Sequence, residues 1–252
     1  MLHLAEQTGN RRKPKLHVAL AHSESEILEA QRLRYRVFAE ELGANLPTRT
    51  PGVDRDIYDP YCKHLIVRDE NNGRIVGTYR ILSPEAAREI GGYYSDNEFD
   101  LVRLHHLRNR IVEVGRSCID PEYRTGATIA LLWSGLANYM MHSGHDYLVG
   151  CASIGMADGG HAAASIFLKL QDHLAPLEYR VFPRNPLPLD KLEYNPAAET
   201  PPLIKGYMRA GAYVCGEPAW DADFKTADLF LLLPMSRINA RYAKHFVERQ
   251  AA

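Results

Sequence analysis

The chain has 252 residues, of which 46% are apolar and 24% are charged, so it is long enough to bury a sizeable hydrophobic core. Thirty basic residues against thirty-one acidic ones give a net charge of −1, which argues against a dedicated nucleic-acid-binding protein. No window approaches the roughly twenty apolar residues of a membrane span, and the N-terminus lacks a secretory apolar segment. The four cysteines are widely spaced. We therefore expect a cytoplasmic protein without a disulfide framework or a zinc finger.

The first half of the chain predicts one helix within a set of strands. Ser23 and Glu26 form a capping box at the start of a helix whose apolar stripe extends to Leu42. The sequence Glu70-Asn71-Asn72-Gly73 predicts a hairpin turn, because asparagine and glycine tolerate positive φ. Apolar patterns predict strands over residues 15–21, 62–69, 74–82 and 111–120.

The second half alternates helices and strands around a Pro-rich insert at residues 174–202. Helices are predicted over residues 127–141, 161–171 and 203–211, the last ending at Gly211 as a natural C′ residue. Strands are predicted over residues 147–153, 213–215 and 228–233. This order predicts a single α/β domain with a mixed central sheet and helices on both faces, preceded by a basic arm at residues 1–14.

Motifs of the familiar chemistries are absent from the sequence. It contains no G-x-G-x-x-G, no G-x-x-x-x-G-K-[ST], no H-E-x-x-H and no G-x-S-x-G. The histidines form no second cluster at ligand spacing, so we expect no bound metal. Cys151 lies in an apolar strand and is expected to be a buried, unreactive thiol. What remains is a chemistry that positions two substrates and moves protons.

Four short charged motifs are embedded in apolar segments. They are Arg34-Tyr-Arg-Val-Phe38, Asp56-Ile-Tyr-Asp59, Gly77-Thr-Tyr-Arg80 and Glu113-Val-Gly-Arg116. A charge within an apolar strand is costly to bury unless it is paired, so Glu113 needs a partner or a function. One interpretation is an ion-pair network of Glu113, Asp59, Arg80 and Arg116 that only holds the fold.

In order and spacing, these motifs resemble those of the acyl-homoserine-lactone synthases, which are acyltransferases of the GNAT superfamily. The wider chain is similar to the hemolysin-like GNAT proteins that include the L-ornithine Nα-acyltransferases. The resemblance runs from about Leu16 to Tyr242 and includes D-x-Y-D-x-x-C-x-H-L-I-V, V-E-V-G-R-S-C-I-D-P-x-Y-R and P-L-I-K-G-Y-M-R-A-G-A-Y. It implies a GNAT-like fold and transfer of a 3-hydroxyacyl chain from acyl carrier protein to the α-amine of ornithine, the first step of ornithine-lipid synthesis.

The resemblance also implies the partners. The phosphopantetheine thioester of an acidic acyl carrier protein would be the co-substrate, L-ornithine the acceptor, and no separate cofactor is expected. A lipid product is compatible with peripheral contact between the protein and the inner face of the membrane. A basic rim would receive the carrier protein, formed by some of the following residues: Arg11, Arg12, Lys13, Lys15, Arg180, Arg184, Arg237, Arg241, Lys244 and Arg249.

One departure from the GNAT pattern concerns the donor. GNAT enzymes bind the pyrophosphate of coenzyme A with a loop Q/R-x-x-G-x-G/A at a helix N-terminus. Here a shorter stretch without the second glycine takes its place: Arg124, Thr125, Gly126, Ala127 and Thr128. A carrier protein presents pantetheine through one phosphodiester, so this smaller cradle favours acyl carrier protein over acetyl-coenzyme A as the donor.

The reaction and the resemblance together assign roles. Attack of an amine on a thioester needs a proton acceptor for the amine and a proton for the thiolate. Glu113 is the candidate base. Tyr207, in a segment similar to the F-Y-x-x-x-G-F of GNAT enzymes, is the candidate acid, with ordinary helix packing as the alternative. An ideal strand points Glu113 and Arg116 to opposite faces, and a bulge at Gly115 would bring them together. The expected acceptor-binding residues are Arg34, Phe38, Asp56, Asp59, Arg80 and Arg116.

Other functions stay open at this point. The acceptor could be another amine such as lysine, glycine or tyrosine. Lactone synthases place a tryptophan shortly after the R-x-x-x-F motif, and residues 43–46 contain none. A membrane-active hemolysin would need a signal segment, a span or a strongly amphipathic basic helix. The apolar helix after Gly126 and the insert around residues 177–189 could wall an acyl tunnel, or simply form core and cover.

Overall fold

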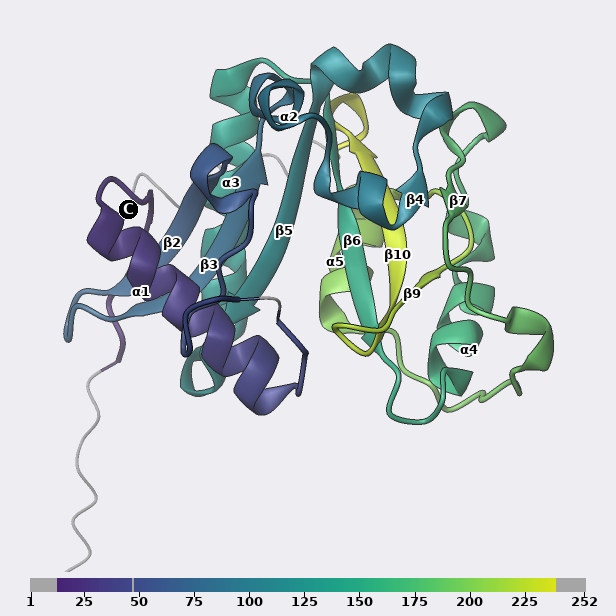
Figure 1. Ribbon diagram of the computed structural model, residues 1–252, viewed down its shortest axis with the longest axis horizontal. Coiled ribbons are helices and arrows are strands. Elements are labelled where there is room, and N and C mark those ends of the chain that lie inside the picture. The colour runs from purple at the N-terminus through teal and green to yellow at the C-terminus, as the bar shows by residue number, and fades with distance from the viewer. Residues whose placement is uncertain (1–12, 47, 239–252) are drawn as a thin grey trace, which may run out of the picture.

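The computed structural model describes residues 13–46 and 48–238. Its centre is a mixed sheet in the order β1-β2-β3-β5-β6-β10-β8, with β9 paired to β10 (Figure 1). Among these strands only the neighbours β5 and β6 are parallel. The strands are β1 (Leu16–Leu20), β2 (Lys63–Asp69), β3 (Ile75–Leu82), β5 (Ile111–Ile119), β6 (Tyr147–Gly155), β8 (Tyr213–Val214), β9 (Ala219–Asp221) and β10 (Thr226–Pro234).

Helices cover both faces of this sheet, as the sequence predicts. Helix α1 (Glu24–Tyr35) packs Ala30 and Leu33 against Ile66. Helix α3 (Gly126–Ser143) packs against Leu65 and Val67 on the opposite face. Because successive strand residues point to opposite faces, β2 serves both helices with alternate side chains.

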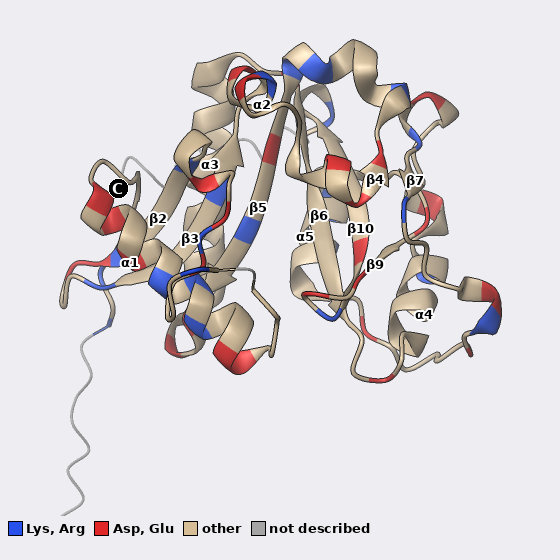
Figure 2. Cartoon of the chain, in the orientation of Figure 1, with Lys and Arg blue, Asp and Glu red and all other residues tan. Residues whose placement is uncertain are grey.

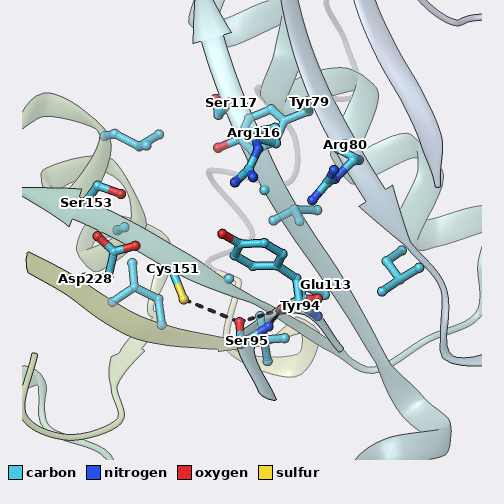
Figure 3. A pocket seen from close by; sticks show the side chains of 18 of the residues that line it. Tyr79, Arg80, Tyr94, Ser95, Glu113, Arg116, Ser117, Cys151, Ser153 and Asp228 are labelled. Atoms are coloured by element: carbon cyan, nitrogen blue, oxygen red, sulfur yellow. Dashed lines mark hydrogen bonds between the residues drawn. The ribbon is translucent and has the colours of Figure 1, made fainter. Parts of the chain in front are cut away.

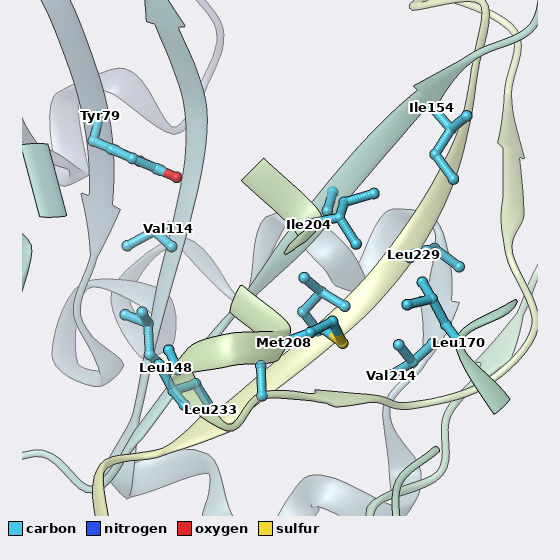
Figure 4. Packing of buried hydrophobic residues seen from close by; sticks show 14 of the residues in the cluster. Tyr79, Val114, Leu148, Ile154, Leu170, Ile204, Met208, Val214, Leu229 and Leu233 are labelled. Carbon is cyan, nitrogen blue, oxygen red and sulfur yellow. The ribbon is translucent and has the colours of Figure 1, made fainter. Parts of the chain in front are cut away.

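The second half of the sheet has its own cover. Helices α4 (His161–Lys169) and α5 (Pro202–Ala210) belong to one apolar cluster with β6 and β10. Figure 4 shows Ile204 and Met208 of α5 beside the strand that carries Leu229 and Leu233. Burying such side chains stabilises the fold by about 1.5–3 kcal/mol each relative to exposure.

The predicted strands and helices are present, and several short elements are new. The hairpin of β2 and β3 is present, with Gly73 at φ 76°, and Gly211 ends α5 at φ 101°. The sequence does not predict α2 (Pro84–Ile90), the ribbon of β4 (Phe99–Asp100) with β7 (Phe182–Pro183), or strand β9. These elements are too short for a periodic apolar pattern. No helix among the described residues is long and apolar enough to cross a membrane.

Strands β5 and β6 pair over only three positions before they diverge. Ile111, Val112 and Glu113 face Tyr147, Leu148 and Val149, and neither strand pairs with the other beyond them (Figure 1). Gly150 stands at this point, where a Cβ would lie 2.3 Å from the carbonyl oxygen of Val114. Only glycine permits that approach, and the gap that opens beyond it holds the site.

Candidate active site

A cavity of about 260 Å³ occupies the gap between the diverging strands (Figure 3). Strand β5 contributes Glu113 and Arg116 to its wall, which Figure 2 shows as an acidic and a basic band on one strand. Strands β6 and β10 contribute the opposite wall. Of the sequence-predicted residues, Phe38, Arg80, Glu113, Arg116 and Tyr207 line this cavity.

Glu113 is 4% exposed and held by the short helical turn Tyr94–Asn97. One carboxylate oxygen accepts the backbone N–H of Tyr94 at 2.6 Å, and the other accepts that of Ser95 at 2.9 Å. The Ser95 hydroxyl also donates to it. Burial raises the pKa of Glu113 above its ordinary value, although these hydrogen bonds and Arg80 act in the opposite direction. A raised pKa makes this carboxylate a better proton acceptor than an ordinary glutamate.

The predicted bulge in β5 is present, but glycine is not its unusual residue. The register shifts opposite Tyr79, because Arg80 faces Gly115 whereas Thr78 faces Cys118. Arg116 takes the left-handed conformation at φ 50°, not Gly115. Such a backbone is costly for a residue with a Cβ, so the surrounding contacts must hold it.

Those contacts surround the Arg116 guanidinium. It stacks between the rings of Tyr94 and Phe224, at 4.8 and 4.4 Å from their centroids. Its nitrogens lie 3.4 Å from a carboxylate oxygen of Asp54 and 3.4 Å from one of Asp56. The side chain is 9% exposed and borders the cavity, so its charge is available to an anionic group there.

The predicted ion-pair network is present behind the cavity, with a different membership. Arg34 is fully buried and binds Asp54 at 2.8 Å and Asp59 at 2.7 Å. Arg80 binds Asp56 at 2.7 Å and Asp59 at 3.2 Å. Burial alone would raise the pKa of Asp59, but Arg34 and Arg80 hold it well below its usual range. The aspartate carboxylates are thus engaged by arginines, and Glu113 is bound by backbone N–H groups instead.

Tyr207 lies on α5 with its hydroxyl 3.0 Å from that of Tyr79, and its ring packs at a tilt of 40° against Trp133. Burial raises the pKa of Tyr207 well above its ordinary value, so the phenol keeps its proton. Tyr207, Leu148 and Leu233 also line a second, mainly apolar cavity of about 400 Å³. The two cavities are therefore neighbours, and Tyr207 stands between them.

The predicted donor cradle lies at the N-terminus of α3. Thr125 caps this helix by accepting the N–H of Thr128, whose hydroxyl donates to the carbonyl of Tyr123. Arg124 forms two hydrogen bonds of 2.6 Å with the carboxylate of Glu41. Gly126 and Ala127 are exposed in the first helical turn. Their position suits an anionic group, while Arg124 is paired with an acid.

Several residues of the cavity were missed by the sequence analysis. Asp228 is 5% exposed in an apolar strand, which is the same signal that singled out Glu113. Asp221, in the preceding strand β9, also lines the cavity. Tyr94 and Ser95 come from a segment without a periodic pattern, and nothing in the sequence indicated that they would bind Glu113.

The expected basic rim is only partly within the described residues. Lys15 pairs with Glu70 at 2.7 Å, and Arg180, Arg184 and Arg237 each donate to a backbone carbonyl. A carrier-protein surface formed by these residues stays a prediction. Arg11, Arg12, Arg241, Lys244 and Arg249 lie outside the described residues.

Comparison with known proteins adds a family to this geometry. The acetyltransferase (GNAT) domain model matches residues 33–134. The L-ornithine N(alpha)-acyltransferase of Agrobacterium fabrum is 40% identical over 249 residues, covering 92% of this chain and 85% of that protein. The protein of the same name from Rhizobium meliloti is 39% identical, covering 92% and 84%. These alignments cover nearly the whole of both chains.

Solved structures support the fold alone. The acyl-homoserine-lactone synthase LasI has a TM-score of 0.55 at 15% identity, covering 94% of this chain and 96% of that one. FeeM, an N-acyl amino acid synthase from uncultured soil microbes, has a TM-score of 0.56 at 13% identity, covering 89% and 94%. The prediction of a GNAT-like fold with a mixed central sheet is confirmed.

Proposed function

Since the chain belongs to the family of the L-ornithine Nα-acyltransferases, we propose that it transfers an acyl chain from a thioester to the α-amine of L-ornithine. The observation that carries this proposal is the buried carboxylate of Glu113 beside Arg116 in the cavity between β5 and β6. An amine acceptor needs a base, and the carboxylate of an amino acid needs a cation. These two side chains supply both.

The chemistry balances with the residues at hand. The α-ammonium loses a proton to Glu113, and the free amine attacks the thioester carbonyl. A C–N bond forms, the C–S bond breaks, and the second proton of the nitrogen passes to water as the amide is completed. Tyr207, kept protonated by burial, donates a proton to the departing thiolate. Glu113 then returns its proton to water, and Tyr207 regains from water the proton that it gives to the thiolate. Phe38, Arg80 and Arg116 would hold the acceptor in place, with Arg34, Asp56 and Asp59 fixing the two arginines from behind.

The donor belongs to the same proposal. The cavity of about 400 Å³ beside Tyr207 has an apolar lining that includes Leu136, Met140 and Ile238, which suits a hydrocarbon chain. Residues 124–128 would receive the single phosphodiester of a carrier protein at the start of α3. A 3-hydroxyacyl carrier protein is the donor that we favour, and the product would be a lyso-ornithine lipid.

The experiment is a transfer assay with purified protein. A 3-hydroxyacyl carrier protein is incubated with ornithine, lysine, glycine and tyrosine, and the free thiol and the acylated amine are measured. We expect thiol release that depends on ornithine, together with Nα-acylornithine by mass spectrometry. The same assay with the matching acyl-coenzyme A tests the choice of donor. Absence of thiol release with every amine would contradict the proposal.

A further inference from the structure

The wall of the cavity that faces Glu113 and Arg116 carries a second group of acidic side chains. Cys151 of β6, Asp228 of β10 and Asp221 of β9 line the cavity, and Glu98 lies beside the first two. One carboxylate oxygen each of Glu98 and Asp228 and the sulfur of Cys151 lie within 4.8 Å of one another. Figure 3 shows Asp228 and Cys151 across the cavity from Arg116 and Arg80.

These acids differ from the aspartates of the ion-pair network because no arginine or lysine among the described residues forms an ion pair with them. Asp54, Asp56 and Asp59 each bind an arginine. Both carboxylate oxygens of Glu98 are buried, and the thiol of Cys151 is the neighbouring group that can donate to them. Asp228 accepts a hydrogen bond from the hydroxyl of Thr226 at 2.7 Å, which is a neutral donor. A buried carboxylate without a cation is costly, and such a site favours a cationic ligand.

The pKa values of Glu98 and Asp228 are both raised, as expected for buried acids that lie close to one another. Burial, together with Asp228 and Asp221, raises the pKa of Glu98 to about 9. Burial and Asp221 raise the pKa of Asp228 to about 6, although the hydroxyls of Thr226 and Ser153 and the more distant charge of Arg116 act in the opposite direction. At neutral pH Asp228 is therefore largely ionised, while Glu98 holds a proton. A cation placed between them would lower both pKa values.

We propose that Asp228, supported by Glu98 and Asp221, binds the side-chain ammonium of a basic amino acid acceptor. This inference rests on the proposed function and names the part of the cavity that selects the acceptor. The α-amine of the acceptor faces Glu113 and its carboxylate faces Arg116, so the side chain extends toward the opposite wall. An ammonium group has three donors and no acceptor, which matches a group of carboxylate oxygens. The uncharged Cys151 thiol makes a metal ion a poorer match than an ammonium group.

The test compares two acceptors that differ only in this ammonium. Ornithine and norvaline (2-aminopentanoate) share one carbon skeleton, and norvaline lacks the terminal amine. We expect the protein to prefer ornithine by about 100-fold in kcat/KM. Asp228→Asn should reduce kcat/KM for ornithine about 10- to 100-fold, mainly through KM, and leave that for norvaline unchanged. Glu98→Gln should act in the same direction and provides a second variant if Asp228→Asn does not fold.

Asp223→Asn is the matched control. It removes the same charge, but Asp223 lies exposed on the turn between β9 and β10. It should keep the full preference for ornithine. If the protein acylates ornithine and Asp228→Asn keeps the same ratio of the two acceptors, the inference is wrong while the proposed function stands. If no amine is acylated, both are wrong. Saturable binding of Zn²⁺ that Asp228→Asn abolishes, with unchanged acceptor preference, would replace the ammonium site with a metal site.

Discussion

The carboxylate of Glu113 accepts two hydrogen bonds from Ser95, one from its backbone N–H and one from its hydroxyl. Glu113 lies in a central strand and Ser95 in the short helical turn Tyr94–Asn97, so the orientation of the base depends on a segment outside the sheet.

Glu113→Gln keeps the volume and removes the base. We expect turnover to fall by about 100-fold or more, with an unchanged circular dichroism spectrum. An unaltered rate would assign Glu113 to structure.

Ser95→Ala extends this prediction to pH. Burial already raises the pKa of Glu113, and the Ser95 hydroxyl stabilises the ionised form. Removing that hydroxyl should raise the pKa further, so activity should be lost at a higher pH as the solution is acidified. The measurement is kcat/KM from about pH 5 to 9. If the acidic side of the pH profile does not move, or moves to lower pH, the assignment of Glu113 as the titrating base is wrong.

Tyr207→Phe removes only a hydroxyl from a partly buried ring. We expect the single-turnover rate to fall by about 10-fold or more, and the Kd of the donor to stay unchanged, because only the proton for the thiolate is lost. Tyr139→Phe on α3 is the matched control, since Tyr139 lies outside both cavities. Equal rates for the two variants would make Tyr207 a packing residue.

Gly150→Ala should harm the protein where Gly155→Ala does not, although both glycines lie on β6. A Cβ at Gly150 meets the Val114 carbonyl at 2.3 Å, whereas a Cβ at Gly155 meets nothing within 4 Å. We expect Gly150→Ala to lower the free energy of unfolding by about 1–3 kcal/mol and to reduce activity. Urea denaturation of both variants measures the difference. Similar values for the two variants would mean that the strands can separate at no cost.

Ala137→Phe should shorten the acyl chain that the protein accepts. Ala137 is a half-buried wall residue of the apolar cavity, so a phenyl ring would take up part of its volume. We expect the KM for a long-chain donor to rise about 10-fold, while that for a short-chain donor changes little. The two donors are each other's control. An equal effect on both chain lengths would place the hydrocarbon elsewhere.

Glu98 should make stability fall as pH rises. Its pKa is raised from 4.5 to about 9, so between these values the folded state keeps a proton that the unfolded state has lost. The free energy of unfolding should therefore decrease by about 1 kcal/mol per pH unit in this window. Glu98→Gln should flatten the dependence, and the exposed control Glu178→Gln should not. Denaturation at several pH values gives the slopes, and parallel slopes would contradict the raised pKa.

The sequence predicts the long elements well because each buries an apolar face with a clear period. It also identifies Glu113 and Arg116, since a charge within an apolar strand is conspicuous. It offers a network of Glu113, Asp59, Arg80 and Arg116, but it does not reveal that Arg34 binds Asp54 and Asp59, because those pairs join residues 20 or more positions apart. The contact between Tyr79 and Tyr207 is hidden in the same way, because 128 positions separate them in the sequence. Asp228, like Glu113, is a charged residue within an apolar strand, but the sequence analysis does not single it out.

The three residue pairs between β5 and β6 have a mechanical consequence. Within the central sheet they are the strand pairing that joins two half-sheets, one carrying Glu113 and the arginines and the other carrying Asp228. An acceptor that reaches both walls is held by two bodies joined along a narrow seam, so a small change in their opening angle alters the distance between its two ends. The backbone amides beside the gap lack strand partners across it, and they should exchange with solvent faster than those of the paired seam. A substrate bound in the gap would contact both half-sheets and hold them together.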